Sequence, residues 1–292
     1  MTLRPRTLAV AGLVERERPL VMGVVNVTPD SFSDGGRFLA ADAAVAHGHE
    51  MLAQGADILD IGGESTRPGA TRPLVAEELS RVLPVVSELA AAGAVVSVDT
   101  MRAEVARAAL EAGARIVNDV SGGLADPEIL AAVAAADAGY IAMHWRGHST
   151  VMADRAHYAD VVGEVRDELS ARVDAALCAG IAAERIAVDP GLGFAKTGEH
   201  NWALLADLEA LDFGFPMLVG ASRKSFLGSL LAAEDGTPRP VSERESAGVS
   251  VTTIAALAGV WGIRVHDVTV NLDALRVVER FNRAGRVEDG QG

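Results

Sequence analysis

The polar residues that could do chemistry in this chain recur at one kind of place, the end of a short apolar run. In chain order they are Asn26, Asp60, Asp99, Asn118, His144, Asp189, Lys224 and His266, with Arg264 two residues before the last. A single aspartate at such a place is about as often a helix cap as a site residue. Eight polar endings are hard to explain by stability alone, because apolar residues and satisfied caps would serve stability better. The pattern indicates one shared site.

These residues divide into two groups by chemistry. The first group is Asp99, Asn118, Asp189 and Lys224. Its acceptors, amide and cation suit a flat heterocycle that has an edge of N–H donors and a carbonyl. The second group is Asn26, Arg264 and His266. It offers an oxygen for a metal ion and two partners for an anion, which suits a phosphate group. The stretch 222–225 opens a predicted helix, where free N–H groups favour a further anion such as a carboxylate.

The apolar runs alternate with amphipathic stretches, and this alternation predicts the fold. The first run begins at Leu20 and stops at Asn26, and it predicts a strand over 21–27 that is buried on both faces, as strands of parallel sheets are. A predicted helix over 40–54 follows it. Eight such units predict a (β/α)8 barrel, in which loops at the carboxyl ends of the strands build the active site. We expect a single domain over 1–285, a short N-terminal strand or hairpin that closes the barrel bottom, and a flexible tail over 286–292. A doubly wound open sheet is the competitor, but no Gly-x-Gly-x-x-Gly motif opens the first predicted helix.

Composition limits the partners. There are 26 basic and 40 acidic residues, a net charge of −14, which argues against general affinity for nucleic acid or an anionic membrane. An anionic ligand must therefore be attracted by a few placed basic residues or by a metal ion. A single cysteine suits a reducing compartment. We find neither a signal-peptide pattern nor an apolar run of about 20 residues, so we expect a soluble, cytoplasmic protein.

Long motifs give the sequence a resemblance to the dihydropteroate synthases, the folate-pathway family that sulfonamide drugs target. The matching stretches appear in family order: 26–36 (NVTPDSFSDGG), 60–69 (DIGGESTRPG), 97–100 (SVDT), 117–119 (VND), 189–194 (DPGLGF), 220–224 (GASRK) and 264–268 (RVHDV). The first two are long and specific, and together the seven span nearly the whole chain. The resemblance implies a TIM barrel that joins 6-hydroxymethyl-7,8-dihydropterin pyrophosphate to p-aminobenzoate, with release of pyrophosphate.

The resemblance also implies roles for individual residues. The pterin ring would be held by Asp99, Asn118, Met143, Asp189, Gly220 and Lys224. The pyrophosphate would be held by Asn26, Arg264 and His266, with Mg²⁺ on Asn26. Two mobile loops, with Phe32 and Asp34 on one and Thr66, Arg67 and Pro68 on the other, would close over p-aminobenzoate beside Phe194 and Ser225. The family is usually homodimeric, so we expect a homodimer with small-molecule substrates.

An SN1-like mechanism suits these residues. Breaking the pterin CH2–O bond builds positive charge on the heterocycle and negative charge on the leaving pyrophosphate. Asp99 and Asp189 would stabilise the first charge, and Arg264, His266 and Mg²⁺ the second, while Lys224 holds the ring. The aniline amine then attacks without a dedicated general base. The closing loops would exclude water that could trap the cation.

Two other functions remain open. A pterin-dependent methyltransferase of the same fold would share the pterin pocket, but it would need neither Arg264 nor His266 for pyrophosphate. A catalytically silent pterin-binding paralogue should lack some of the strand-end residues, and none is missing here. Asp60 and Glu64 receive no chemical role; we expect structural hydrogen bonding under the second loop.

Overall fold

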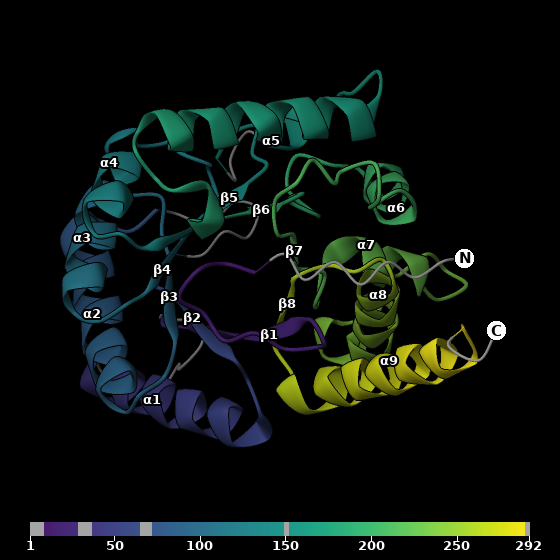
Figure 1. Ribbon diagram of the computed structural model, residues 1–292, viewed down its shortest axis with the longest axis horizontal. Coiled ribbons are helices and arrows are strands. Elements are labelled where there is room, and N and C mark those ends of the chain that lie inside the picture. Colours follow the sequence, from purple (N-terminus) through teal and green to yellow (C-terminus); the bar gives the residue numbers. More distant parts are fainter. Residues whose placement is uncertain (1–8, 29–36, 65–71, 149–151, 290–292) are drawn as a thin grey trace.

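Eight parallel strands form one sheet in the order β6-β5-β4-β3-β2-β1-β8-β7. The computed structural model describes residues 9–28, 37–64, 72–148 and 152–289. β6 and β7, at the two ends of this order, are joined by a bridge between Val188 and Met217, and Val188 N donates to Pro216 O at 2.8 Å. The ring of strands is thereby nearly closed, and helices surround it (Figure 1). The predicted (β/α)8 barrel is confirmed.

Strands and helices alternate along the chain. The strands are β1 (Leu20–Asn26), β2 (Ile58–Gly62), β3 (Val96–Asp99), β4 (Ile116–Asp119), β5 (Gly139–Met143), β6 (Ile186–Asp189), β7 (Leu218–Val219) and β8 (Gly262–Val265). The helices are α1 (Arg37–Gln54), α2 (Val75–Ala91), α3 (Ala103–Glu111), α4 (Glu128–Ala135), α5 (Val161–Cys178), α6 (Gly198–Ala206), α7 (Ser225–Leu230), α8 (Glu245–Leu257) and α9 (Val268–Asp289). Short 3-10 turns lie at Ala153–Arg155, Ala183–Arg185 and Val241–Glu243. The predicted division at residue 285 stays a prediction.

The helices begin where the sequence supplies caps. Asp160 accepts a hydrogen bond from Gly163 N at 3.2 Å and starts α5, and Thr197 Oγ1 accepts one from His200 N at 3.3 Å and starts α6. Buried apolar residues of the strands and helices then form one large cluster between the two layers. None of the helices in the described ranges is both long enough and apolar enough to span a bilayer.

The inside of the barrel has an apolar lower half and a polar upper half. Side chains alternate along a strand, so residues two or four apart share a face. Met22, Ile58, Ile116 and Ala187 belong to an apolar cluster in the lower interior. The polar residues on the same faces, further along the same strands, are Asn26, Asp60, Asn118 and Asp189. The strands thus place these four polar side chains in the upper interior.

The segment before β1 plugs the lower end. Val10 is buried and Leu13 partly buried in the lower apolar cluster, and Ala11 N donates to Glu184 O at 2.7 Å. The expected strand or hairpin is wrong for the described part of this segment, because residues 9–19 form turns and irregular backbone. The bottom is closed by side chains instead, since the strand ring leaves no free edge with which a further strand could pair. Residues 1–8 lie outside the described ranges.

Candidate active site

A guanidinium lies among the carboxylates in the upper interior. Arg264, on β8, donates from Nε to Asp60 Oδ2 at 2.6 Å and from Nη2 to Asp99 Oδ2 at 2.7 Å. Asn118 Nδ2 also donates to Asp60 Oδ2, at 3.0 Å. Burial raises the pKa of Asp99 to about 7, although Arg264 acts in the opposite direction. One buried carboxylate, Asp60, therefore orients both an arginine and an amide of the predicted site.

Asp189 and Lys224 belong to the same polar interior. Burial raises the pKa of Asp189, and the nearby Lys224 opposes that shift. Burial lowers the pKa of Lys224 to about 8, and Asp189 opposes that shift in turn. Lys224 donates to Leu192 O, and its side chain runs so close to Gly193 that an added Cβ there would lie 3.0 Å from Lys224 Cδ. A Cβ on Gly220 would meet Arg264 Cβ at 3.5 Å and Asp189 Oδ2 at 3.9 Å, so Gly220 belongs to the same space.

The predicted phosphate partners adjoin this cluster. A Cβ placed on Gly62 would lie 3.7 Å from both Asn26 Oδ1 and Asp99 Oδ2, so these two oxygens flank the same point. His266 Nδ1 lies 3.1 Å from Ser222 Oγ. The two groups separated by chemistry in the sequence are therefore continuous in space. Arg264, predicted to bind pyrophosphate, contacts two of the acidic side chains around the predicted ring site.

Apolar side chains supply a wall. Met101, Val120 and Met143 form a small buried cluster against which Trp145 and Phe194 pack. The Phe194 ring lies 4.8 Å from Lys224 Nζ. Flat apolar surface beside acceptors and cations is the lining that planar, polar-edged ligands require. This arrangement can hold a nitrogen heterocycle and stabilise opposite charges that develop at its two ends.

Comparison with known proteins agrees with this geometry. Residues 22–266 match the family described as pterin binding enzyme. A dihydropteroate synthase of Mycobacterium leprae is 57% identical over 267 residues, which cover 91% of this chain and 94% of that protein. The chain belongs to the dihydropteroate synthase family. Among the solved structures of dihydropteroate synthases, that of Xanthomonas albilineans with 4-aminobenzoic acid has a TM-score of 0.85 and 46% identity, with 93% of this chain and 96% of that chain covered. That of Burkholderia cenocepacia complexed with 7,8-dihydropteroate has a TM-score of 0.83 and 42% identity, with 94% and 95% covered.

Most residues for which the family resemblance predicts a role are described, and five are not. Phe32, Asp34, Thr66, Arg67 and Pro68 lie outside the described residues. The segment 65–71 is flanked by Glu64 and Arg72, whose side chains pair at 3.0 Å, which agrees with the structural role expected for Glu64. Ser225 is exposed at the start of α7. Asp60 also has a structural role, but inside the barrel rather than under the second loop.

His144 does not face the barrel mouth, so its predicted place among the converging residues is wrong. It follows Met143, whose side chain faces inward, and therefore points outward. It is 1% exposed, and its Nε2 lies 3.0 Å from Glu168 Oε2 on α5. Its Nδ1 lies 2.8 Å from Lys196 Nζ. The sequence reasoning missed Lys196, although a lysine two residues after Phe194 of the matched motif was a signal.

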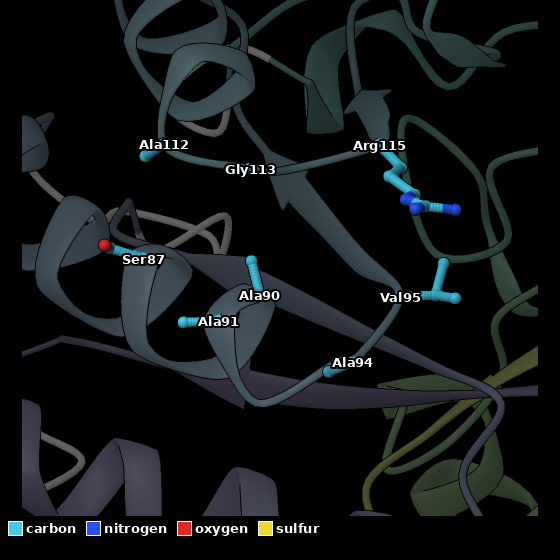
Figure 2. Close-up of a pocket in the computed structure, with 9 residues that line it drawn as sticks. Ser87, Ala90, Ala91, Ala94, Val95, Ala112, Gly113 and Arg115 are labelled. Atoms are coloured by element: carbon cyan, nitrogen blue, oxygen red, sulfur yellow. The ribbon is translucent and has the colours of Figure 1, made fainter.

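A cavity lies away from this site. About 400 Å³ in volume, it is lined at the C-terminal end of α2 by Ser87, Ala90 and Ala91, and near α3 by Ala112 and Gly113 (Figure 2). Arg115 and Val95, just before β4 and β3, complete it. It therefore opens at the amino ends of the strands, which contribute to stability in barrels of this type rather than to catalysis. Its lining consists of alanines, glycines, Ser87 and Val95, with Arg115 as the one charged side chain, and gives no reason to assign it a ligand.

The buried ring of His144 predicts a pH dependence of stability. Burial lowers the pKa of His144 to about 4, so between about pH 6.5 and 4 the unfolded chain takes up a proton that the folded chain does not. The contribution is present above pH 6.5 and is lost as the pH falls towards 4. We expect the free energy of unfolding to fall by up to about 3 kcal/mol over this window from this group. Urea unfolding at several pH values should show a shallower dependence for His144→Gln. The exposed His49 provides the control His49→Gln, and equal slopes in all three proteins would contradict the assignment.

Proposed function

We propose that this chain is a dihydropteroate synthase, joining 6-hydroxymethyl-7,8-dihydropterin pyrophosphate to p-aminobenzoate with release of pyrophosphate. The observation that carries the proposal is the convergence of Asp99, Asn118, Asp189 and Lys224, with Arg264, in the upper interior of one barrel. Family membership and the apolar wall at Met143 and Phe194 support it.

The proposed reaction uses these groups to separate charge. The pterin CH2–O bond breaks, its electron pair leaves with pyrophosphate, and the ring carries the positive charge. Asp99 and Asp189 accept hydrogen bonds from the ring edge and stabilise that charge, while Lys224 donates to the ring carbonyl. Arg264 has five N–H donors, two of which bind Asp60 and Asp99, so the others are left for the leaving group, together with His266. The amine nitrogen of p-aminobenzoate then forms the new C–N bond and releases a proton.

Turnover of variants tests the proposal. We expect pyrophosphate release to require p-aminobenzoate in the wild type, and kcat/KM to fall on the order of 100-fold or more in Asp189→Ala and Lys224→Ala, because each removes a charge from the reacting centre. Asp273→Ala, which breaks only an exposed pair with Arg276, should leave turnover unchanged. A folded wild type that binds 6-hydroxymethylpterin but forms no product would favour the silent paralogue. Methyl transfer from a reduced folate would favour the methyltransferase.

We propose that a magnesium ion binds beside Asn26. Its amide oxygen and Asp99 Oδ2 would each lie 3.7 Å from a Cβ on Gly62, and Mg²⁺ binds through few protein oxygens plus substrate phosphates. No group of three or more His, Cys, Asp or Glu in the described ranges is arranged to hold a metal by itself. Bound there, the ion would neutralise charge on the leaving pyrophosphate. Asn26→Ala should raise the Mg²⁺ concentration needed for half-maximal turnover by about tenfold, a typical loss at altered metal sites. Unchanged Mg²⁺ dependence, or full turnover in EDTA, would contradict this assignment.

We also propose that the protein is a homodimer through α9. Val270, Val277 and Phe281 are 39%, 68% and 62% exposed, and their spacing puts them on one face of this helix. Such an exposed apolar stripe is typical of an interface. Phe281→Glu should convert the dimer to a monomer in sedimentation, whereas Leu177→Glu on α5 should not. A wild type that sediments as a monomer would contradict the proposal.

We also propose a cytoplasmic location, which the single cysteine and the proposed small-molecule substrates support. Recovery of the protein in a membrane or exported fraction of its cells would refute it.

A further inference from the structure

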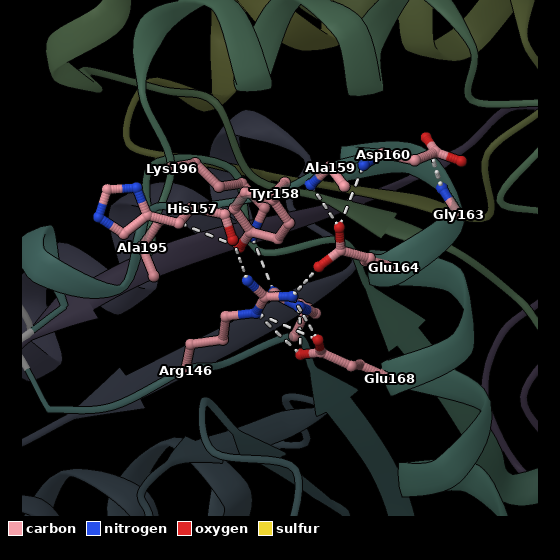
Figure 3. Close-up of polar contacts among 11 residues, drawn as sticks. Arg146, His157, Tyr158, Ala159, Asp160, Gly163, Glu164, Glu168, Ala195 and Lys196 are labelled. Carbon is pink, nitrogen blue, oxygen red and sulfur yellow. Dashed lines mark hydrogen bonds and ion pairs between the residues drawn. The ribbon is translucent and has the colours of Figure 1, made fainter.

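A second polar cluster lies outside the barrel mouth, behind the carboxyl ends of β5 and β6. Figure 3 shows Arg146, Tyr158, Glu164, Glu168 and Lys196 of this cluster. His144 also belongs to it, because its ring contacts both Glu168 and Lys196. The proposed reaction uses none of these side chains. Three of them, His144, Arg146 and Tyr158, belong to the segment between β5 and α5. Lys196 and Tyr158 hydrogen-bond directly to the loop between β6 and α6, which runs from 190 to 197, and the other four side chains are linked to these two.

Burial lowers the pKa of Lys196 to about 7, and in the protonated form each of its three N–H donors has a partner. The partners are His144 Nδ1 at 2.8 Å, Gly191 O at 3.0 Å and Phe194 O at 3.0 Å. Two carbonyls of one loop are therefore bound to a single cation. With the ammonium of Lys196 donating to His144 Nδ1, the ring proton lies on Nε2 and is donated to Glu168. The low pKa of His144 agrees with this neutral ring.

Arg146 supports the same loop indirectly, through Tyr158. Its Nη2 donates to Glu164 at 2.7 Å, its Nε lies 3.1 Å from both Glu168 oxygens, and its guanidinium lies 3.8 Å over the Tyr158 ring. The Tyr158 hydroxyl donates to Ala195 O at 3.0 Å. Burial raises the pKa of Tyr158 to about 12, so this donor keeps its proton. Lys196 and Tyr158 thus hydrogen-bond to three carbonyls of the loop, those of Gly191, Phe194 and Ala195.

The loop needs this support because its backbone is not one that a chain adopts readily. Gly191, Gly193 and Ala195 all have positive φ, at 67°, 79° and 47°. Ala195 is one of few non-glycine residues with positive φ in the described ranges, and such a residue costs free energy. Ala195 directly precedes Lys196. Its backbone conformation turns the chain so that the Lys196 side chain can bond to carbonyls of the same loop.

The front of the loop touches the site. Gly191 N donates to Asp189 Oδ1 at 2.7 Å, Leu192 O accepts from Lys224, and the Phe194 ring faces Lys224 Nζ. A shift of the loop therefore moves the partners of both Asp189 and Lys224. Composition adds a separate observation: only two of the 26 basic residues are lysines, and they are Lys196 and Lys224. The chain uses arginine everywhere else, but a compact ammonium with three donors at these two places.

We propose that Lys196 is a positioning residue of the active site, which, braced by His144 and the Arg146–Tyr158 pair, fixes the β6–α6 loop so that Lys224 and Phe194 face the pterin. The inference rests on the proposed function for the identity of the ligand.

The test uses the two lysines as reporters. Protein labelled with ¹³C-lysine gives two Cε signals, and Lys196→Met leaves only that of Lys224. We expect this remaining signal to shift from its wild-type position, and the Kd for 6-hydroxymethylpterin to rise on the order of 10- to 100-fold. Tyr158→Phe, which removes one bond to the loop, should change both in the same direction by less. If Lys196→Met does not fold, the milder variant decides by the same two measurements.

The matched control is Arg185→Met. Arg185 precedes the opposite end of β6, pairs with Asp137 and donates to Ala11 O, so it too is a partly buried cation bound to backbone. It should lower stability without moving the Lys224 signal or the pterin Kd. An unmoved Lys224 signal together with unchanged pterin affinity in folded Lys196→Met, or equal effects in Arg185→Met, would overturn the proposal. Both measurements are made without turnover, so a wild type that binds pterin but makes no product would contradict the proposed function alone.

Discussion

The site depends on one guanidinium inside the barrel. Arg264 bonds to Asp60 and Asp99 at once, and Asp60 has no exposed surface. Without a cation between them, two carboxylates in this interior would repel each other, and each would lack the water that it has in the unfolded chain. The same arginine fixes the carboxylate that orients Asn118. The carboxylates proposed to bind the ring and the cation that stabilises them in the folded chain therefore belong to one hydrogen-bonded group.

The barrel makes this arrangement possible by dividing its interior. The apolar lower layer contains the side chains of most strands and the plug from residues before β1. The polar layer above it has its partners far apart in sequence, 204 residues for Asp60 with Arg264 and 165 for Asp99 with Arg264. Until β8 joins the ring, Asp60 and Asp99 lack the guanidinium that bonds to both of them. This part of the polar layer is therefore complete only when the ring of strands is complete.

The sequence was sufficient for the barrel and for most of the strand-end residues, because apolar runs with polar ends mark both. It was insufficient for the direction of His144. β5 is buried along its whole length, so it has no alternation from which inward and outward faces could be read. It was also insufficient for Asp60, whose partners come from β4 and β8 and leave no local pattern. The turn-forming segment before β1 was misjudged because apolar residues that plug an interior look like a strand. Lys196 needed the folded loop, since its partners are mostly backbone carbonyls.

The junction between β6 and β7 has the fewest backbone bonds around the described ring: β7 has two residues, and one bridge joins it to β6. Asp189 ends β6, and the chain after β7 leads to Lys224. The two side chains proposed to bind opposite parts of the pterin therefore stand on the two sides of the weakest seam of the barrel. A rigid planar ligand bound to both side chains would therefore cross-link β6 and β7 at the place where the fewest backbone hydrogen bonds connect neighbouring strands.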